Sequence, residues 1–300
     1  MKATKYLWLA TLFSIWIFPD SVLAAPITFN TALPVAKNAF VNREQVVLRR
    51  FKKDRSSADR RLDVNAVVFV LGYGITPKLA VFTAIPYLDK SLSLSMEDRR
   101  TSRSSSAIGD VRIFGRYTLF QKDMRSKTFR IAAFGGIKAP TGQNKKTDIL
   151  GNLPVPLQSG SGSLDEFGGI VATYQTLPFQ IDGQLSYRHN GAANSFQAGD
   201  QFRADLSLQY RLLPQILTRD TSSFIYGVLE TTLLKQETNR LSTTKDPNSG
   251  GTTVFITPGF QYVTRKWILE TAVQIPLIQN LNGNALKTDF VFTSGFRVNF

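Results

Sequence analysis

The sequence predicts an all-β fold, a transmembrane up-and-down antiparallel β-barrel of about twelve strands. The closing segment, Phe290 to Phe300, alternates between apolar and polar side chains and ends on an aromatic residue. Before it, segments of roughly ten to fourteen residues with strand character are separated by connections that are alternately tight and long. After the first residues, no apolar run approaches the ~18 residues that a membrane helix needs, so a membrane protein of this sequence must be a barrel.

The first residues are typical of an export signal. Lys2 and Lys5 precede an apolar stretch, and a small-residue cleavage pattern ends at Ala24 and Ala25. We expect a signal peptide at residues 1–24 and an outer-membrane barrel domain at residues 25–300, with cleavage after Ala24 or one residue later. An uncleaved membrane anchor is the alternative, but the stretch is short for one and is interrupted by proline and aspartate.

Composition excludes several classes of function. Cleavage leaves 276 of the 300 residues, which suits one domain, and lowers the net charge from +14 to +13. The chain has no cysteine, which excludes thiol catalysis and cysteine metal sites and fits an exported protein that does not depend on disulfides. Its positive charges are spread along the alternating segments, without a cluster interleaved with aromatics, so nucleic acid is not an expected partner.

The connections predict which end of the barrel each turn occupies. Tight connections are expected at the periplasmic end and long polar loops at the external end, because outer-membrane barrels interleave the two. The tight ones are predicted at residues 76–78, 121–127, 176–178, 213–220 and 264–266. The long ones are predicted at residues 52–61, 91–107, 141–163, 190–199, 236–250 and 279–283.

The segments between these connections are the expected strands. An even number of strands returns both chain ends to the periplasmic side. Alternation is poorest in the first segment and in residues 221–235. The predicted ranges are 42–51, 62–75, 79–90, 108–120, 128–140, 164–176, 178–189, 200–212, 221–235, 251–263, 266–277 and 284–300.

Parity within a strand predicts which side chains meet lipid, because a charge at mid-membrane on the lipid face costs ~2–4 kcal/mol. Residues 200–212 are the clearest case, with one apolar and one polar face. Three further segments, 108–120, 128–140 and 178–189, follow the same rule. The candidate pore-lining residues are Asp110, Arg112, Arg116, Arg130, Lys138, Asp182, Arg188, Arg203, Asp205, Arg211 and Arg297, and Glu230, Glu270 and Asp289 share the inward parity.

Two interpretations of this charged interior remain open. The residues could pair into a ladder that fills and rigidifies a narrow barrel, since buried charges must find partners. Alternatively, the arginine excess could line a water-filled pore that favours anionic solutes. A barrel of about twelve strands lies between the filled eight-stranded and the open sixteen-stranded kinds.

Aromatic residues and prolines add further expectations. Seven aromatics near strand ends suit interfacial girdles, although strand propensity alone also enriches aromatics; they are Tyr87, Tyr117, Phe120, Tyr187, Tyr210, Tyr262 and Trp267. Pro86, Pro258 and Pro276 fall inside predicted strands, where each removes a backbone donor, so we expect bulges or strand ends there.

No residue pattern predicts catalysis. His189 has outward parity near the external rim, but the next position of that parity is Gly191, and no serine follows it as in a lipid hydrolase. The carboxylates lack metal-ligand spacing, and residues 246–251 lack the regular oxygens of a calcium loop. We expect no catalytic, metal or cofactor site.

The order of motifs resembles one known family. The motifs are Ile108 to Leu119 with its Gly-Asp pair, Lys138-Ala-Pro-Thr-Gly142, Leu157-Gln-Ser-Gly-Ser-Gly162, Gly199-Asp200, Thr257-Pro-Gly-Phe-Gln-Tyr262 and Asn282-Gly283. From about Ala36 to Phe300 the chain is similar to the family labelled as the MetA pathway of phenol degradation, a set of outer-membrane transporters. The resemblance implies an outer-membrane barrel that takes up small compounds, aromatic ones among them, and it brings no catalytic residues to transfer.

The predicted function is therefore a bacterial outer-membrane channel for passive uptake of small solutes, aromatic or anionic. Its expected partners are outer-membrane lipid, the solute, and the barrel-assembly machinery, which would recognise the C-terminal Phe300. Loop 141–163, bracketed by the Pro-Thr-Gly and Gly-Ser-Gly motifs, could fold inward and gate the pore, or could be a mobile surface loop. The two rival functions are an outer-wall lipid-modifying enzyme and a non-conducting structural barrel.

Overall fold

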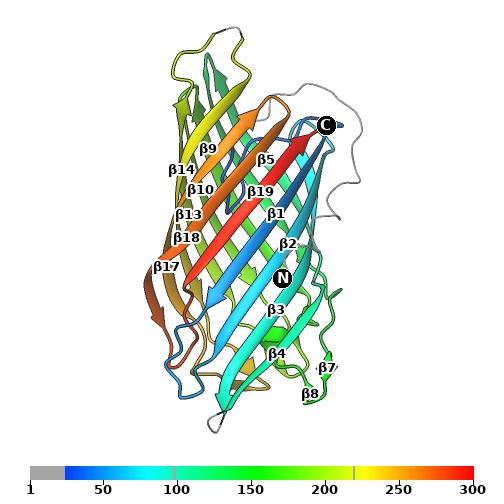
Figure 1. The fold of residues 1–300 in the computed structure, drawn as a ribbon. Helices are drawn as coiled ribbons and strands as arrows, with labels where there is room; N and C mark the ends of the chain where they lie inside the picture. Colours follow the sequence, from blue (N-terminus) through cyan, green and yellow to red (C-terminus); the bar gives the residue numbers. More distant parts are fainter. Residues whose placement is uncertain (1–23, 97–98, 219) are drawn as a thin grey trace.

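The computed structural model describes residues 24–96, 99–218 and 220–300. They form one closed antiparallel barrel, with small two-residue strands only in the loops (Figure 1). The predicted signal peptide lies outside the described residues apart from Ala24. Among the residues described, none belongs to a helix with the length and apolar character needed to span a membrane.

The barrel has twelve strand positions, as the sequence predicted. Its thirteen long strands reduce to twelve positions because β4 and β5 both pair with β3, one above the other. The strands are β1 Phe40–Phe51, β2 Arg61–Gly74, β3 Leu79–Met96, β4 Arg99–Ile108, β5 Arg112–Met124, β6 Lys127–Lys138, β9 Asp165–Thr176, β10 Phe179–His189, β13 Gln201–Leu213, β14 Ser223–Gln236, β17 Gly251–Thr264, β18 Trp267–Leu281 and β19 Phe290–Asn299.

The first and last strands close the cylinder. β1 pairs with β19 from Val41↔Asn299 to Arg50↔Phe290 and with β2 on its other side. At the end of this seam the backbone amides of Phe40 and Phe300 donate to each other's carbonyls, at 2.6 and 3.0 Å. We call the end with these residues and the tight connections the turn end, and the opposite end the loop end.

The loops contain only short elements. The connection between β6 and β9 holds β7 Thr147–Asp148, β8 Gly151–Asn152 and the 3-10 helix η1 Val155–Leu157. Two neighbouring loops meet in a small sheet made of β11 Ala192–Ala193, β12 Phe196–Gln197, β15 Arg240–Leu241 and β16 Thr244–Lys245.

The prediction of a loop at residues 91–107 is wrong, because residues 91–96 and 99–107 belong to two paired strands. β3 continues to Met96 and returns as β4, which pairs with it from Tyr87↔Ile108 to Met96↔Arg99. The Ser-Leu alternation of residues 91–95 carried this strand signal, with Leu92 and Leu94 facing inward against loop residues. The predicted strand 108–120 is accordingly two strands, interrupted at residues 109–111.

Two other boundaries are also corrected. The tight connection predicted at 121–127 is only the two residues between Met124 and Lys127, so β5 is longer than expected. The last strand begins at Phe290 and not at residue 284. Residues 282–289 form a loop. The Gln279 side-chain amide holds it by donating to the Thr288 carbonyl and accepting from the Thr288 backbone amide, both at 2.9 Å.

The three prolines lie where the strand ladder is irregular. Pro276 lies at the register shift between β17 and β18, and Pro258 falls between the Ile256↔Ile275 and Gly259↔Ala272 pairs, where no pairing with β18 is recorded. Pro86 lies opposite the break between β4 and β5, and its carbonyl accepts a bond from the Gly109 amide at 2.8 Å. Bulges therefore accommodate Pro276 and Pro86, as expected, whereas at Pro258 the ladder with β18 is interrupted without a change of register.

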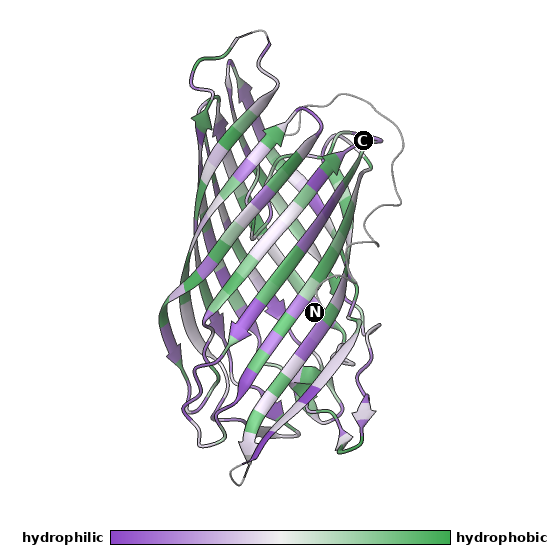
Figure 2. Ribbon diagram, in the orientation of Figure 1, coloured by the Kyte–Doolittle hydropathy of each residue, from purple (hydrophilic) through white to green (hydrophobic). Residues whose placement is uncertain are grey.

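The two faces of the wall are inverted relative to a soluble protein. Large apolar side chains such as Leu206, Leu208 and Tyr210 are exposed on the outside, whereas Gln209, Glu230 and Glu270 are almost fully buried inside. Hydrophobic and hydrophilic residues follow one another along the strands (Figure 2). This pattern suits a barrel whose outside meets lipid and whose inside meets water or polar partners.

The loop between β1 and β2 is tied down by one carboxylate. Asp54 accepts bonds from the backbone amides of Ser56 and Arg60 at 3.1 and 2.8 Å and from the Arg60 guanidinium at 2.8 Å. The guanidinium bond from Arg60, with the Ser56 hydroxyl and the two amides, holds the pKa of Asp54 below its ordinary value of 3.8.

This lowered pKa predicts how the loop responds to acid. A carboxylate with a depressed folded-state pKa contributes stability above its unfolded pKa and loses it as pH falls through the folded value. We expect the Ser56 and Arg60 amide resonances, followed by NMR from pH 6 downward, to titrate with a midpoint below 3.8 and not to titrate in Asp54→Asn. A midpoint at or above 3.8 would contradict the assignment.

Candidate functional site: the barrel interior

The segment before β1 lies inside the barrel. We call residues 24–39 the plug segment. Six of its apolar residues are buried, namely Ala24, Ala25, Ile27, Phe29, Ala32 and Leu33. Ala32 packs in one cluster with Ala132 and Phe134 of β6 and Val171 of β9, so the segment crosses from the β1 side to the opposite wall. In Figure 1 it is the dark blue loop within the cylinder near the turn end.

Interior side chains of the wall hold the plug segment through its backbone. Glu230 of β14 accepts bonds from the Ile27 amide at 2.7 Å and the Thr28 amide at 3.2 Å. On the other wall, Thr173 of β9 accepts a bond from the Ala32 amide at 2.8 Å, and Asp182 of β10 accepts one from the Thr31 hydroxyl at 3.0 Å. The segment is not paired with the sheet as a strand, so it could leave without opening the wall.

Arginine side chains bind the carbonyls of the same segment. Arg116 donates to Thr31 at 2.8 Å and to Leu33 at 2.6 Å, and Arg43 donates to the Ile27 carbonyl at 2.8 Å. Arg203 reaches the Thr28 carbonyl at 3.3 Å. Charged donors and acceptors thus satisfy a buried backbone that has no β-ladder of its own.

Loss of the Glu230 charge is expected to loosen the plug segment. Glu230→Gln keeps the shape but leaves one acceptor oxygen for Ile27 and Thr28, and bonds to charged groups are worth about 1.5–3 kcal/mol each. We expect more frequent channel openings in planar bilayers, by about tenfold or more, since ~1.4 kcal/mol corresponds to a factor of ten. Glu166→Gln, on the outward face of β9, is the matched control. Equal opening frequencies in the two variants would contradict the role of Glu230.

The structure places all eleven candidate pore-lining residues inside the barrel, in three groups. Arg116, Asp182, Arg203, Asp205 and Arg297 lie around the plug segment, where Arg203 pairs with Asp205 at 2.8 Å. Arg130 and Arg211 lie nearer the turn end, Arg130 at 3.2 Å from Asp123 and Arg211 over the Phe224 ring. Asp110, Arg112, Lys138 and Arg188 lie toward the loop end.

Asp110 and Lys138 join three motifs that are far apart in the sequence. The Lys138 ammonium lies 2.7 Å from Asp110 and 3.1 Å from Asp165, and all three side chains are buried. Asp110 also accepts bonds from the Gly142 amide at 3.0 Å and the Ser161 amide at 2.9 Å. Both ends of loop 139–164 are therefore anchored on one carboxylate.

The glycines of these motifs allow their backbones to touch. A Cβ atom added at Gly142 would lie 2.8 Å from the Cα of Gly160, closer than real Cβ contacts come. Further along the loop, Leu153 and Leu157 are buried against Leu92 of β3, which faces inward. The loop thus folds onto interior side chains at the loop end, as the sequence suggested it could.

Four cations line the lumen between the plug segment and the loop end. They are Arg49, Lys90, Arg112 and Arg188, from β1, β3, β5 and β10. In the described part of the chain none of them lies within 4.0 Å of a carboxylate, and Arg49 and Arg112 are exposed to the lumen. Their charges are close enough to act on one another. Beside them, β2 and β3 turn apolar residues inward, among them Val64, Ala66, Val68, Ala84 and Leu88.

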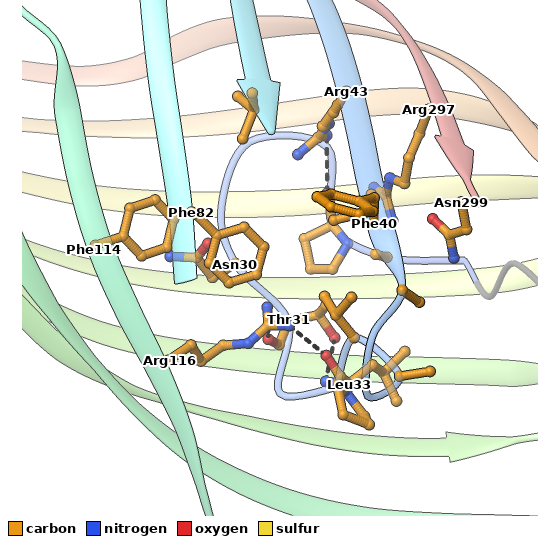
Figure 3. Close-up of a pocket in the computed structure, with 18 of the residues that line it drawn as sticks. Asn30, Thr31, Leu33, Phe40, Arg43, Phe82, Phe114, Arg116, Arg297 and Asn299 are labelled. Atoms are coloured by element: carbon orange, nitrogen blue, oxygen red, sulfur yellow. Dashed lines mark hydrogen bonds between the residues drawn. The ribbon is translucent and has the colours of Figure 1, made fainter. Parts of the chain in front are cut away.

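A cavity of about 280 Å³ lies between the plug segment and the wall. Aromatic rings of Phe29, Phe82 and Phe114 and the guanidinium groups of Arg43, Arg116 and Arg297 line it. Figure 3 shows Arg116 directed at Thr31 and Leu33, with Phe82 and Phe114 to one side and Arg43 and Arg297 on the far side. Phe40 and Phe300 also line it, so it lies at the turn end.

The sequence analysis missed the plug segment and three interior cations, Arg43, Arg49 and Lys90. Residues 24–39 contain no period of two or 3.6, so only their long-range partners identify them. Arg43 and Arg49 lie in the segment with the poorest alternation, and no face was assigned to it. Lys90 is the last residue of the predicted segment 79–90, whose faces were not assigned. The signal that was available was Glu230 and Glu270, two inward carboxylates with no obvious partner in the neighbouring sequence.

The fold resembles a solved outer-membrane channel. The COG4313 outer membrane channel from Pseudomonas putida F1 superposes with a TM-score of 0.65 at 14% identity, covering 93% of this chain and 100% of that one. The CymD monoaromatic hydrocarbon channel gives a TM-score of 0.40 at 11% identity, covering 88% and 89%. The β domain of the Bordetella autotransporter BrkA gives 0.44 at 10% identity, covering 88% and 100%.

The comparison with curated proteins finds no match to this chain. The comparison with protein families does. Residues 52–275, well over half of the chain, match the family described as "Putative MetA-pathway of phenol degradation", and the protein therefore belongs to this family, as its motifs predicted.

Proposed function

We propose that this protein is an outer-membrane channel for the passive uptake of small organic solutes, and that its plug segment closes the lumen at rest. The observation that carries the proposal is that the plug segment fills the interior through bonds to side chains and forms no strand of the sheet; only its last two residues, Asn38 and Ala39, bond to the sheet backbone, at Gly74. A barrel with a purely structural role does not need an interior segment that can leave. A gated channel needs one that can leave while the barrel wall stays closed.

Location in the outer membrane follows from the same physics. Exposed leucine and tyrosine side chains on the outer wall have no place in water, and the aromatic residues at the strand ends would lie at the lipid headgroups. The turn end, which carries both Phe40 and Phe300, would face the periplasm. The basic leader and small-residue pattern at residues 1–24 would direct export and then be removed.

The lumen favours anionic over cationic solutes. Unpaired positive charge along a low-dielectric wall raises the local concentration of anions. In the plug-deleted channel, replacing Arg49, Arg112 and Arg188 together by glutamine is expected to abolish anion preference. Arg125→Gln, in the exposed turn between β5 and β6, is the control and should leave it unchanged. A cation-preferring reversal potential before any substitution would refute the proposal.

The direct test of uptake is liposome swelling with phenolics, sugars and organic acids of similar size. We expect small organic acids and phenolics to enter faster than sugars, since the lumen combines an apolar stripe on β2 and β3 with cations. Vesicles that swell with none of these solutes, although the barrel is inserted and folded, would favour the structural alternative.

The lipid-modifying alternative has no supporting geometry in the described residues. His189 lies at the loop end of β10, where its Nδ1 bonds to Asp200 at 2.8 Å, and the Tyr187 hydroxyl donates to the same carboxylate at 2.8 Å. A nucleophile would need its own hydroxyl bond to the imidazole. We propose that the His189 group fastens the external loop and that the chain performs no covalent chemistry.

A further inference from the structure

The cavity beside the plug segment combines two kinds of recognition in one small space. Phe82 and Phe114 stack with their ring centroids 4.9 Å apart and nearly parallel, at 13°. The Arg116 guanidinium lies over the Phe82 ring at 4.8 Å. One wall therefore offers aromatic faces and a cation next to each other.

Positive charge exceeds negative charge around this cavity. Glu270 is shared between Arg43, which donates to it at 2.7 Å, and Arg297 at 3.6 Å. Arg116 lies within 4.0 Å of no carboxylate in the described ranges, and its hydrogen-bond partners are the Thr31 and Leu33 carbonyls. A buried guanidinium held only by neutral acceptors is poorly compensated, since its strongest partners are carboxylates in bidentate geometry.

We propose that this cavity binds a small aromatic carboxylate, with the ring against Phe82 and Phe114 and the carboxylate on Arg116, and that binding releases the plug segment. The volume of about 280 Å³ falls just below the roughly 300–1,000 Å³ of drug-sized sites, which suits a one-ring molecule. The carboxylate competes with the Thr31 and Leu33 carbonyls for the same guanidinium. A carboxylate carries a full negative charge and can accept two parallel bonds from the guanidinium, whereas each carbonyl is neutral and accepts one, so the ligand displaces the carbonyls.

This inference rests on the proposed function in one respect, namely that the plug segment closes the channel. It adds the class of molecule that opens the channel and the residue at which it acts. Binding and conduction are measured separately, so the two proposals can fail separately. A barrel that binds benzoate but never conducts would overturn the proposed function and leave the binding site standing.

The binding test uses the complete mature protein in detergent, with benzoate, benzyl alcohol and acetate titrated by calorimetry. We expect benzoate to bind at least about tenfold more tightly than benzyl alcohol, which lacks the charge, and than acetate, which lacks the ring. Arg116→Gln should abolish benzoate binding, and Arg130→Gln, an interior arginine outside the cavity, should retain it. Should Arg116→Gln fail to fold, Arg116→Lys is the alternative. It keeps the positive charge but loses the planar guanidinium that binds a carboxylate through two parallel bonds, so it should weaken benzoate binding at least about tenfold.

The release test uses the absence of cysteine in the chain. In an Ala32→Cys/Ala132→Cys variant the only thiols lie in one packed cluster, on the plug segment and on β6. Benzoate should slow oxidative cross-linking of this pair several-fold, and benzyl alcohol should not. Equal affinities for benzoate and benzyl alcohol, no benzoate binding, or benzoate binding with an unchanged cross-linking rate would each overturn the proposal.

Discussion

Deletion of Ile27 to Leu33 is expected to raise single-channel conductance several-fold and to speed liposome swelling with small organic acids. These seven residues carry the bonds to Glu230, Thr173, Asp182 and Arg116 that hold the plug segment across the lumen. The segment precedes β1 and shares no ladder with it, so the deletion leaves every strand pair of the barrel in place.

The freed interior should remain stable because water can enter it. Glu230, Asp182 and Arg116 lose their plug partners, but a hydrated lumen solvates charges that a dry interior could not. Heat-modifiable gel migration and the amide band in the infrared confirm that the variant is folded. Conductance that stays at the wild-type level in the folded deletion variant would show that the segment does not close the pore.

The Ala32→Cys/Ala132→Cys variant tests the opposite change, in which the plug segment is held in place and not removed. When oxidised it should hold the plug segment in place and suppress openings below the wild-type frequency, and reduction should restore them. Openings that are insensitive to oxidation of the pair would place the barrier elsewhere, with loop 139–164 as the next candidate.

The faces of the strands could be predicted because a membrane barrel imposes one rule on each of them. Leu206 and Leu208 alternate with Asp205 and Ser207, and a one-residue error would put charge into lipid. The rule is local, so it can be read from a few residues at a time. The strand number and the end at which the chain termini lie were predicted separately, from the alternation of tight and long connections.

Features that depend on distant partners could not be predicted in the same way. The plug segment has no period of its own, and its conformation is set by Glu230 and Thr173, more than a hundred residues away. The hairpin of β3 and β4 was hidden because serine on its outward face has the composition of a loop. Its inward Leu92 has its partner, Leu157, in another loop.

The motifs that carried the family resemblance acquire a physical meaning in the folded chain. Gly109-Asp110, Lys138 to Gly142 and Ser159 to Gly162 are separate in the sequence but converge on one ion pair. Sequence alone suggested that they bracket a loop. Only the fold shows that Asp110 ties both ends of that loop to the barrel wall.

Replacing Lys138 by methionine is therefore expected to be among the most destabilising single changes in the barrel. The side chain is buried and compensates two buried carboxylates, Asp110 at 2.7 Å and Asp165 at 3.1 Å. Removing one partner from a buried ion cluster typically costs ~3–5 kcal/mol, because the remaining charges are left without compensation. Urea unfolding of the variant in lipid or detergent should show a loss of this size.

Two further variants separate charge from packing. Arg130→Met also removes an interior cation, but its partner Asp123 is half exposed, so the expected loss is about 1 kcal/mol or less. Asp110→Asn combined with Lys138→Met leaves only Asp165 unpaired and should recover part of the stability lost in Lys138→Met alone. If Lys138→Met and Arg130→Met lose the same stability, or the double variant is the least stable of all, packing and not charge compensation holds this junction together. The position of loop 139–164 would then depend on Leu157 and on the Gly142–Gly160 contact. The interior charges would affect only which solutes the lumen favours.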